Sequence, residues 1–241
     1  MDTRPNGEPL LSLRNVTHTY GSGPGRVTAL YDVSLDIFPG QMIVVCGPSG
    51  SGKTTLLNLL GLLDRPTIGE VVLENRQCAS LTEDERAVVR NQAVGFVFQQ
   101  FHLLPTMTVM ENVLVPLWLS ENSARARVDK SWRARQAQAH QQAQKLLIDV
   151  GLADKLQRYP SELSVGQQQR VAIVRALVND PEVIVADEPT SSLDPHSAGE
   201  IATLLIRLNR ERKTLVIATH DDKLLNIGDQ IIRLSNGRII R

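Results

Sequence analysis

The sequence predicts an α/β domain in which a mostly parallel core sheet is accompanied by an antiparallel β subdomain and an inserted helical subdomain. Three observations indicate this fold class. Apolar runs of strand length alternate with helical segments, which is typical of a parallel sheet covered by helices. Val33, Leu35 and Ile37 alternate instead with polar residues, as in a half-buried antiparallel strand. Residues 106–150 are mostly helical in pattern and interrupt the strand–helix alternation.

The expected strands and helices follow from apolar patterning and from turn and capping residues. Strands are expected at residues 42–46, 71–73, 94–98, 183–186 and 215–219. Longer helices are expected at residues 53–63, at residues 164–179 and around residues 201–208. Thr82 and Glu85 form a capping-box pattern that opens a short helix. Asn236 and Gly237 predict the turn of a hairpin over residues 231–240.

Length and composition bound the functional classes. The chain has 241 residues, of which 42% are hydrophobic, and this excludes a disordered chain. We expect one domain over residues 1–241, with the helical subdomain at about residues 100–178. The 26 Lys and Arg balance the 26 Asp and Glu, so we expect no nucleic acid as a partner. Cys46 and Cys78 form no CxxC pair and indicate reduced thiols in a cytoplasmic protein.

Neither a signal peptide nor a membrane span is expected. Residues 1–9 are polar and lack the apolar region of a signal peptide. The richest apolar stretch, residues 103–119, is broken by Pro105, Glu111 and Pro116. A role at a membrane therefore requires another subunit to hold the chain there. Residues 120–148 carry a local net charge of +4, which is typical of a solvated amphipathic helix, although a docking face for a partner or for anionic lipid is the alternative.

A glycine-rich loop gives the clearest signal for a ligand. The sequence GPSGSGKT fits the pattern GxxxxGK[ST], and it lies between an expected strand and an expected helix, as this motif requires. The glycines let backbone N–H groups surround a phosphate, and the helix N-terminus adds partial positive charge. Lys53 is expected to reach the terminal phosphates and to serve catalysis, and Thr54 to ligate Mg²⁺. The residues assigned to nucleotide binding here are Gly47, Pro48, Ser49, Gly50, Ser51, Gly52, Lys53, Thr54 and Thr55.

Polar residues at the ends of other expected strands complete this constellation. Asp187 is expected to hold Mg²⁺ through water, and Glu188 to polarise the attacking water. His220 is expected to contact phosphate or water as a further catalytic residue. The amide of Gln99 is a candidate for the Mg²⁺ shell or for a contact with the water. Three histidines outside this context are expected at the surface, namely His18, His140 and His196.

The segment LSVGQQQR, residues 163–170, resembles the LSGGQ segment of the ABC-type ATPase domains. The resemblance covers nearly the whole chain and implies a P-loop NTPase fold of the ABC ATPase type. It implies that Ser164 and Gly166 contact the γ-phosphate held by a second copy, and it assigns Gln167 to the nucleotide as well. Ser164 also has the character of a helix N-cap, and the helix that it opens offers free N–H groups to an anion. Val165 departs from the usual glycine, and valine does not readily adopt a positive φ.

Further positions match this family. The segment at residues 191–194 resembles the D-loop, which implies that Asp194 couples the two sites across the dimer. Tyr20 resembles the aromatic residue that stacks on adenine, with Tyr31 as the competing candidate. Gln99 matches the glutamine of the Q-loop.

The resemblance implies an ATPase that uses ATP and Mg²⁺, dimerises around ATP and drives a membrane transporter. Its partners are a second copy of itself and integral membrane permease subunits, which hold it at the cytoplasmic face of the cell membrane. In the family, motion passes to these subunits near the Q-loop, where Phe101, Leu103 and Leu104 suit a docking groove or, alternatively, pack in the core.

Residues 56–67 and 94–117 look like the ATPase subunits of lipoprotein-release and macrolide-export systems, from which the segment at residues 190–192 departs. Two other functions remain open. The first is a soluble ABC-type ATPase acting on DNA or ribosomes, although such proteins usually carry two cassettes or long coiled coils. The second is a P-loop kinase, which leaves the segment LSVGQ unexplained.

Overall fold

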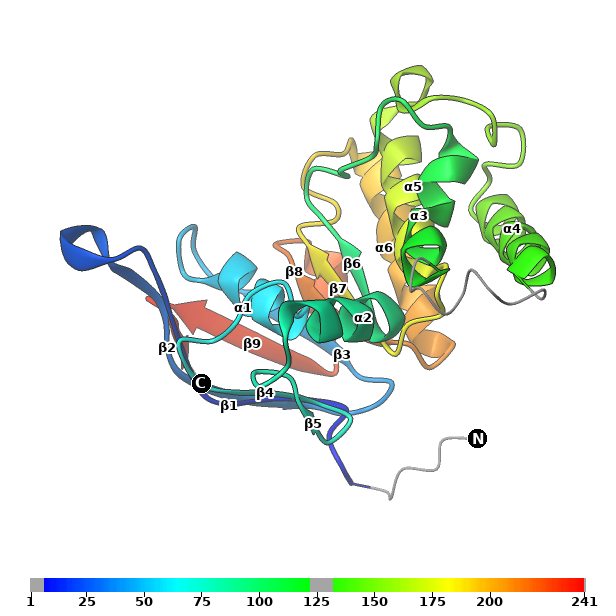
Figure 1. Ribbon diagram of the computed structural model, residues 1–241. Helices are drawn as coiled ribbons and strands as arrows, with labels where there is room; N and C mark the ends of the chain where they lie inside the picture. The colour runs from blue at the N-terminus through cyan, green and yellow to red at the C-terminus, as the bar shows by residue number, and fades with distance from the viewer. Residues whose placement is uncertain (1–6, 122–131, 241) are drawn as a thin grey trace.

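The structure is a computed structural model that describes residues 7–121 and 132–240 (Figure 1). Within this part of the chain, the strands form a six-stranded sheet in the order β10-β9-β3-β8-β7-β6 and a four-stranded sheet in the order β2-β1-β4-β5. The first sheet is parallel except for β10, and the second is antiparallel. The predicted fold class is therefore confirmed.

The core sheet is buried at its centre on both faces. Its strands are β3 (Met42–Cys46), β6 (Val94–Val97), β7 (Val183–Asp187), β8 (Thr214–Ala218), β9 (Gln230–Ser235) and β10 (Arg238–Ile240). Along β3, Ile43 and Val45 belong to one apolar cluster, while Met42 and Val44 belong to another on the opposite face. Because β3, β6, β7 and β8 run parallel, the loops that follow them meet at one edge of the sheet.

The antiparallel sheet covers one face of the core sheet. It contains β1 (Leu11–Tyr20), β2 (Val27–Ile37), β4 (Ile68–Leu73) and β5 (Arg76–Gln77), and a 3-10 turn, η1 (Gly23–Gly25), lies between β1 and β2. His18 was expected at the surface, but only 7% of it is exposed, so this prediction was wrong. His18 lies two residues after the buried Val16 and therefore on the same face of β1.

The helices of the core lie on both faces of the main sheet. They are α1 (Lys53–Leu60), α2 (Glu83–Ala93), α5 (Val165–Leu177), α6 (Pro195–Arg210) and the short α7 (Asp222–Leu225). Helix α1 shares a cluster with the antiparallel sheet, whereas α5 and α6 pack on the other face. The predicted capping box of Thr82 and Glu85 opens α2. Helix α1 ends three residues earlier than expected, because Leu62 adopts a left-handed φ of 56°.

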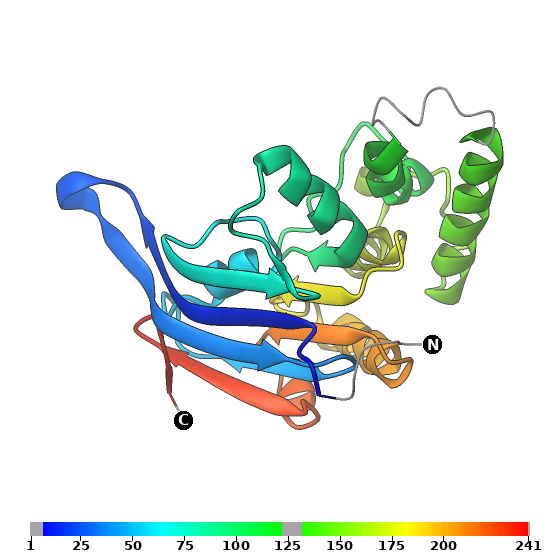
Figure 2. The same ribbon diagram turned by 60° about the horizontal axis from the view of Figure 1, so that its bottom comes forward.

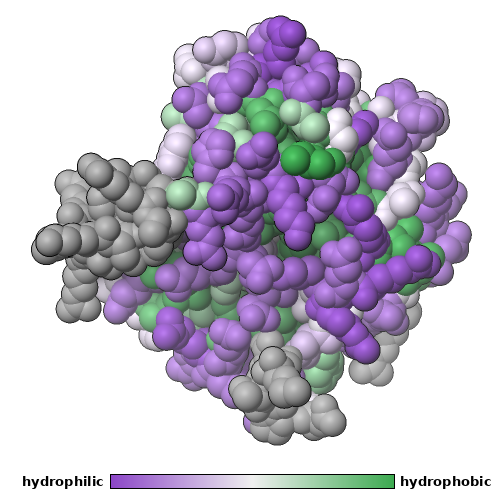
Figure 3. All heavy atoms as spheres, turned by 90° about the vertical axis from the view of Figure 1, so that its right-hand side faces the viewer, coloured by the Kyte–Doolittle hydropathy of each residue, from purple (hydrophilic) through white to green (hydrophobic). Residues whose placement is uncertain are grey.

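A third apolar cluster joins α3 (Val109–Glu121), α4 (Trp132–Asp149) and α5 at one end of the molecule (Figures 1 and 2). A 3-10 turn, η3 (Pro160–Glu162), precedes α5. The boundaries of the helical subdomain stay a prediction. Most of the positive charge expected over residues 120–148 lies outside the described residues or on side chains that the structure does not describe. Seen from this end, the surface is largely hydrophilic, with apolar residues mainly in hollows between polar ones (Figure 3).

The described residues include no helix that combines the length and the hydropathy needed to cross a bilayer.

Candidate functional site

A cleft of about 730 Å³ lies at the edge where the parallel strands of the core sheet end. One wall comes from the glycine-rich loop and the start of α1, namely Ser49, Gly50, Gly52, Lys53, Thr54 and Thr55. The loops after β6, β7 and β8 add Gln99, Asp187, Glu188, Ser191 and His220. The cleft therefore brings together side chains that the sequence suggested separately from four segments.

The loop at residues 47–54 has the backbone that its glycines permit. Gly47 has a φ of 153°, and a Cβ there would lie 2.1 Å from the carbonyl oxygen of Leu234. Gly52, with a φ of 105°, is the N-cap of α1. The Lys53 ammonium donates to the carbonyl oxygens of Gly47 at 2.8 Å and Pro48 at 3.3 Å. The lysine charge and the N-terminus of α1 thus converge on the loop, as an anion site requires.

Glu188 has the most unusual environment in the cleft. Its φ of 47° is in the left-handed region, which is strained for a side chain of this size. Burial raises the pKa of Glu188, whereas the charges of His220 and Lys53 lower it and Asp187 raises it. His220 Nε2 lies 3.3 Å from Glu188 Oε1. A carboxyl group held in this way suits a general base that accepts a proton from water.

Ser191 links Gln99 to the backbone of Glu188. The Gln99 amide donates to Ser191 Oγ at 3.4 Å, and Ser191 Oγ donates to the carbonyl oxygen of Glu188 at 3.0 Å. Ser191 was not among the predicted site residues, although it begins the segment that resembles the D-loop. Its place in the loop that follows Asp187, four residues beyond the end of β7, was the available signal.

The side chains assigned to Mg²⁺ in the cleft all offer oxygen atoms as ligands. Among the described residues, no group of three or more His, Cys, Asp or Glu side chains lies close enough to hold a metal ion. The Thr54 hydroxyl, the Asp187 carboxylate and the Gln99 amide line one cleft. This sparse set of hard oxygen ligands fits Mg²⁺, which keeps several waters and is completed by substrate phosphates.

The Tyr20 side chain is not among those that line the cleft. Its hydroxyl donates to Asp64 Oδ2 at 2.8 Å, and its ring meets His18 edge-on. Burial raises the pKa of Tyr20, and a hydrogen bond with Thr55 lowers it, which places the tyrosine beside a residue of the cleft. Tyr31, the competing candidate, lines the cleft and carries the Arg238 guanidinium 5.1 Å from its ring centre. The adenine role of Tyr20 stays a prediction.

Residues of the LSVGQ segment lie outside the cleft. Ser164 is the N-cap of α5, where its Oγ accepts from the Gln167 N–H at 3.3 Å and Gln167 Oε1 accepts from the Ser164 N–H at 3.0 Å. Ser164 and Val165 are exposed. Val165 is the first residue of α5 and needs no positive φ, so valine fits the backbone there.

The N-terminus of α6 adjoins that of α5. A Cβ on Gly166 would meet Ser197 Oγ at 2.7 Å, which shows how closely the two helix ends approach. Asp194 is the N-cap of α6, and its carboxylate accepts from the N–H groups of His196 and Ser197, each at 3.0 Å. Hydrogen bonds from Ser197 lower the pKa of Asp194. The predicted residues Ser164, Gln167 and Asp194 therefore belong to a second surface, separate from the cleft, and Gly166 is buried beneath it where the two helix ends meet.

Comparison with known proteins identifies the family. Residues 30–191 match the family model described as ABC transporter. An uncharacterized ABC transporter ATP-binding protein of Methanocaldococcus jannaschii is 45% identical over 231 residues, which cover 96% of this chain and 98% of that protein. The macrolide export ATP-binding/permease protein MacB of Pasteurella multocida is 43% identical over 233 residues, which cover 97% of this chain.

The chain spans only 34% of that MacB protein, about a third of its length. Among solved structures, the dimeric ATP-binding cassette MJ0796 in a post-hydrolysis state with ADP and Pi matches with a TM-score of 0.83 and 41% identity. That match covers 96% of this chain and 97% of the other. The chain belongs to the ABC transporter family, which confirms the resemblance found in the sequence.

Lys53→Ala should weaken ATP binding. A hydrogen bond to a charged group contributes about 1.5–3 kcal/mol, so the dissociation constant should rise roughly ten- to a hundredfold. Titration with a fluorescent ATP analogue measures this change. Lys155→Ala is the matched control, because Lys155 pairs with Asp154 away from the cleft. Wild-type affinity in Lys53→Ala would contradict the assignment of the loop.

The pH profile of ATP hydrolysis should depend on the contact between Glu188 and His220. A base must be unprotonated, so activity falls as pH drops through the raised pKa of Glu188, and this acid limb should lie above the ordinary range of a glutamate. His220→Ala removes a charge that lowers this pKa, so the limb should move to still higher pH. The profile of kcat/KM measures it, with exposed His140→Ala as the control. An unmoved limb in His220→Ala speaks against Glu188 as the titrating base.

Proposed function

We propose that this chain is an ATP-hydrolysing subunit that dimerises around ATP and powers a membrane transporter of the export or lipoprotein-release type. One observation carries the proposal. The cleft contains the phosphate loop and the Glu188–His220 pair, whereas the exposed cap of α5 lies on another surface. A nucleotide in the cleft is therefore covered from one side only, and a second copy supplies Ser164 and Gly166 on the other.

Dimerisation around ATP follows from this division of the site. Each copy offers the free N–H groups at the start of α5 to the γ-phosphate in the cleft of the other copy. Moving a pair from 1:99 to 99:1 closed requires about 5.5 kcal/mol, which two shared nucleotides can supply. The dimeric structures of the similar cassette MJ0796 support this arrangement.

The residues of the cleft then have distinct tasks in hydrolysis. Lys53 offsets the charge of the β- and γ-phosphates. Glu188 accepts a proton from water as the water attacks the γ-phosphorus, and ADP leaves with the electrons of the broken bond. His220 holds the Glu188 carboxylate in place and contacts the γ-phosphate. A magnesium ion, when bound through Thr54, Asp187 and Gln99, supplies positive charge that stabilises the transferring phosphoryl group.

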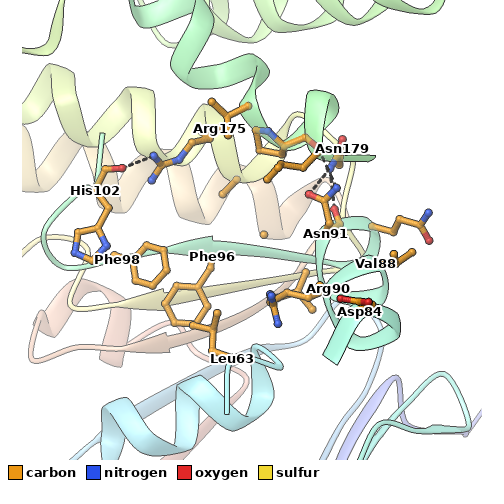
Figure 4. A pocket seen from close by; sticks show the side chains of 18 residues that line it. Leu63, Asp84, Val88, Arg90, Asn91, Phe96, Phe98, His102, Arg175 and Asn179 are labelled. Carbon is orange, nitrogen blue, oxygen red and sulfur yellow. Dashed lines mark hydrogen bonds between the residues drawn. The ribbon is translucent and has the colours of Figure 1, made fainter. Parts of the chain in front are cut away.

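The permease subunits dock in a second groove. This groove has a volume of about 700 Å³ and lies between α2, α3 and the end of α5 (Figure 4). Its lining includes the apolar Leu63, Phe96 and Phe98 and the polar Arg90 and Asn179. A groove with a mostly apolar lining and a few polar side chains suits the apolar face of a helix of another protein.

The groove differs from the sequence-based expectation in its lining. Phe101, Leu103 and Leu104 are not among the residues that line it. Leu103 packs instead against the cluster of the helical subdomain, which was the alternative considered for these residues. The groove nevertheless begins at the Q-loop, since Phe98 and His102 line it.

The proposed place in the cell follows from these partners. The MacB proteins carry their ATP-binding and permease functions in one chain, and the present chain matches only a third of that length. In the proposed assembly, permease subunits hold this chain at the cytoplasmic face of the membrane. After hydrolysis, the lost contacts to the γ-phosphate reopen the pair, and this motion passes through the groove to the permease.

Glu188→Gln should separate ATP binding from hydrolysis. The amide keeps the shape of the side chain but cannot accept the proton, so kcat should fall roughly a hundredfold or more while ATP still binds. Dimers should accumulate with ATP and Mg²⁺, as measured by size-exclusion chromatography with light scattering. Glu211→Gln, the same change at the end of α6, is the control. A monomeric preparation that hydrolyses ATP at full rate at every protein concentration would overturn the proposal.

Val88→Glu should weaken docking to the permease. Val88 lines the groove and is 54% exposed, so a charge there can be solvated without disturbing the core. In detergent extracts, the wild type should co-purify with an integral membrane protein, whereas Val88→Glu should lose it and still bind ATP. Ile240→Glu, a similarly exposed site on β10, is the matched control. Equal recovery of the membrane protein with Val88→Glu and the wild type would exclude this groove.

A further inference from the structure

Arg175 of α5 holds the backbone of the loop that follows Gln99. Its Nη1 donates to the carbonyl oxygen of His102 at 2.6 Å (Figure 4). Its Nη2 donates to the carbonyl oxygen of Phe101, also at 2.6 Å. The two nitrogens of one planar guanidinium group thus bind two successive carbonyl groups. This fork restricts both the position and the orientation of the peptide units that it contacts.

The two carbonyl groups belong to residues in a strained conformation. Phe101 has a φ of 25° and His102 a φ of 48°, which are unusual for residues of this size. Such conformations persist only where surrounding contacts hold them. The ring of His102 also stacks on Phe98, with 4.8 Å between the ring centres. Arg175 therefore stabilises a turn that the local sequence would not adopt by itself.

Arg175 is committed to this backbone contact. Within the described part of the chain, no carboxylate lies within ion-pair distance of its guanidinium group. Burial lowers its pKa, but a guanidinium group stays protonated in proteins. The positive charge of Arg175 thus strengthens the two hydrogen bonds to the loop instead of forming a salt bridge.

A second anchor holds the loop a little further along. Asn112 of α3 is fully buried, and its Oδ1 accepts from the Leu104 N–H at 2.7 Å while its Nδ2 donates to the Leu104 carbonyl oxygen at 3.1 Å. Both anchors lie on helices that share the third apolar cluster. Gln99, only two residues before the first anchor, reaches Ser191 in the cleft.

We propose that Arg175 is a positioning residue for ATP hydrolysis, which keeps Gln99 in the cleft by fixing the backbone at residues 101–102. It also ties the position of Gln99 to α5, the helix whose cap presents Ser164 and Gly166 to the second copy. Arg175 touches neither nucleotide nor metal in this role. The inference rests on the proposed function. It adds Arg175 to the residues that support hydrolysis, and it adds a physical connection between α5 and Gln99.

The test is a double-mutant cycle between Arg175→Gln and Gln99→Ala. A small displacement of a catalytic group can reduce the rate roughly a hundredfold, so we expect Arg175→Gln to lower kcat roughly ten- to a hundredfold, with KM for ATP within about threefold of the wild type. If Arg175 acts through Gln99, the double variant should be no slower than Gln99→Ala alone. The Mg²⁺ concentration for half-maximal hydrolysis should rise alike in both single variants.

Two further variants distinguish positioning from folding. Arg175→Lys keeps the charge and one donor direction, so it should recover part of the lost kcat, and it serves as the test protein if Arg175→Gln does not fold. Arg170→Gln is the matched control, because Arg170 also lies on α5 but binds the Val150 carbonyl oxygen and Glu200. We expect its kcat to stay near that of the wild type.

Several outcomes would overturn the inference. Rate losses that multiply in the double variant, or an unchanged kcat in Arg175→Gln, would show that Arg175 does not act through Gln99. Equal losses of kcat and of melting temperature in Arg175→Gln and Arg170→Gln would indicate a structural role only. Failure of the proposed function is distinguishable, because the wild type and Arg170→Gln would then either show no ATP hydrolysis or hydrolyse ATP at full rate as monomers.

Discussion

The burial of β3 on both faces is the constraint on which the site depends. Its side chains alternate between two apolar clusters, and its backbone is hydrogen-bonded to β8 on one side and β9 on the other. The carboxyl end of the strand leads directly into the glycine-rich loop. The phosphate loop therefore begins at Gly47, where a side chain would collide with the Leu234 backbone. The cleft lies at this edge, where the glycine-rich loop and the start of α1 turn backbone N–H groups toward it.

Features encoded by neighbouring residues were predictable from the sequence, and contacts between distant segments were not. The phosphate loop, the residues at the ends of β7 and β8, and the caps at Thr82 and Ser164 all follow local rules of glycine conformation and N–H satisfaction. The burial of His18 and the place of Tyr31 in the cleft depend on how the antiparallel sheet packs. The alternation along β1 places His18 on the face of Val16, but whether the far end of that face is covered depends on segments distant in the sequence.

The pKa of the Glu188 carboxyl group depends on opposing effects of burial and of neighbouring charges. Burial raises the pKa of Glu188, and the positive charges of His220 and Lys53 oppose this effect. A bound nucleotide would bring negative phosphates close to Lys53. The lysine charge would then lower the pKa of Glu188 less than it does in the empty cleft. The contact with His220 then matters more when the nucleotide is present than when the cleft is empty. In the proposed mechanism, the Glu188–His220 pair thus adjusts the pKa of the base while the nucleotide is bound.

Arg175 of α5 lines the groove and also contacts the Q-loop. It therefore connects the groove with the cleft that contains Gln99. Its side chain lines the groove, while its guanidinium nitrogens bind the carbonyl oxygens of Phe101 and His102. A helix seated in the groove would press on the residue that fixes the turn after Gln99. In the proposed mechanism, a partner in the groove and a nucleotide near Gln99 act on the same loop, so the binding of each would change the affinity for the other by the same factor. Transport and hydrolysis can then be linked through a loop of a few residues, without a rearrangement of the core sheet.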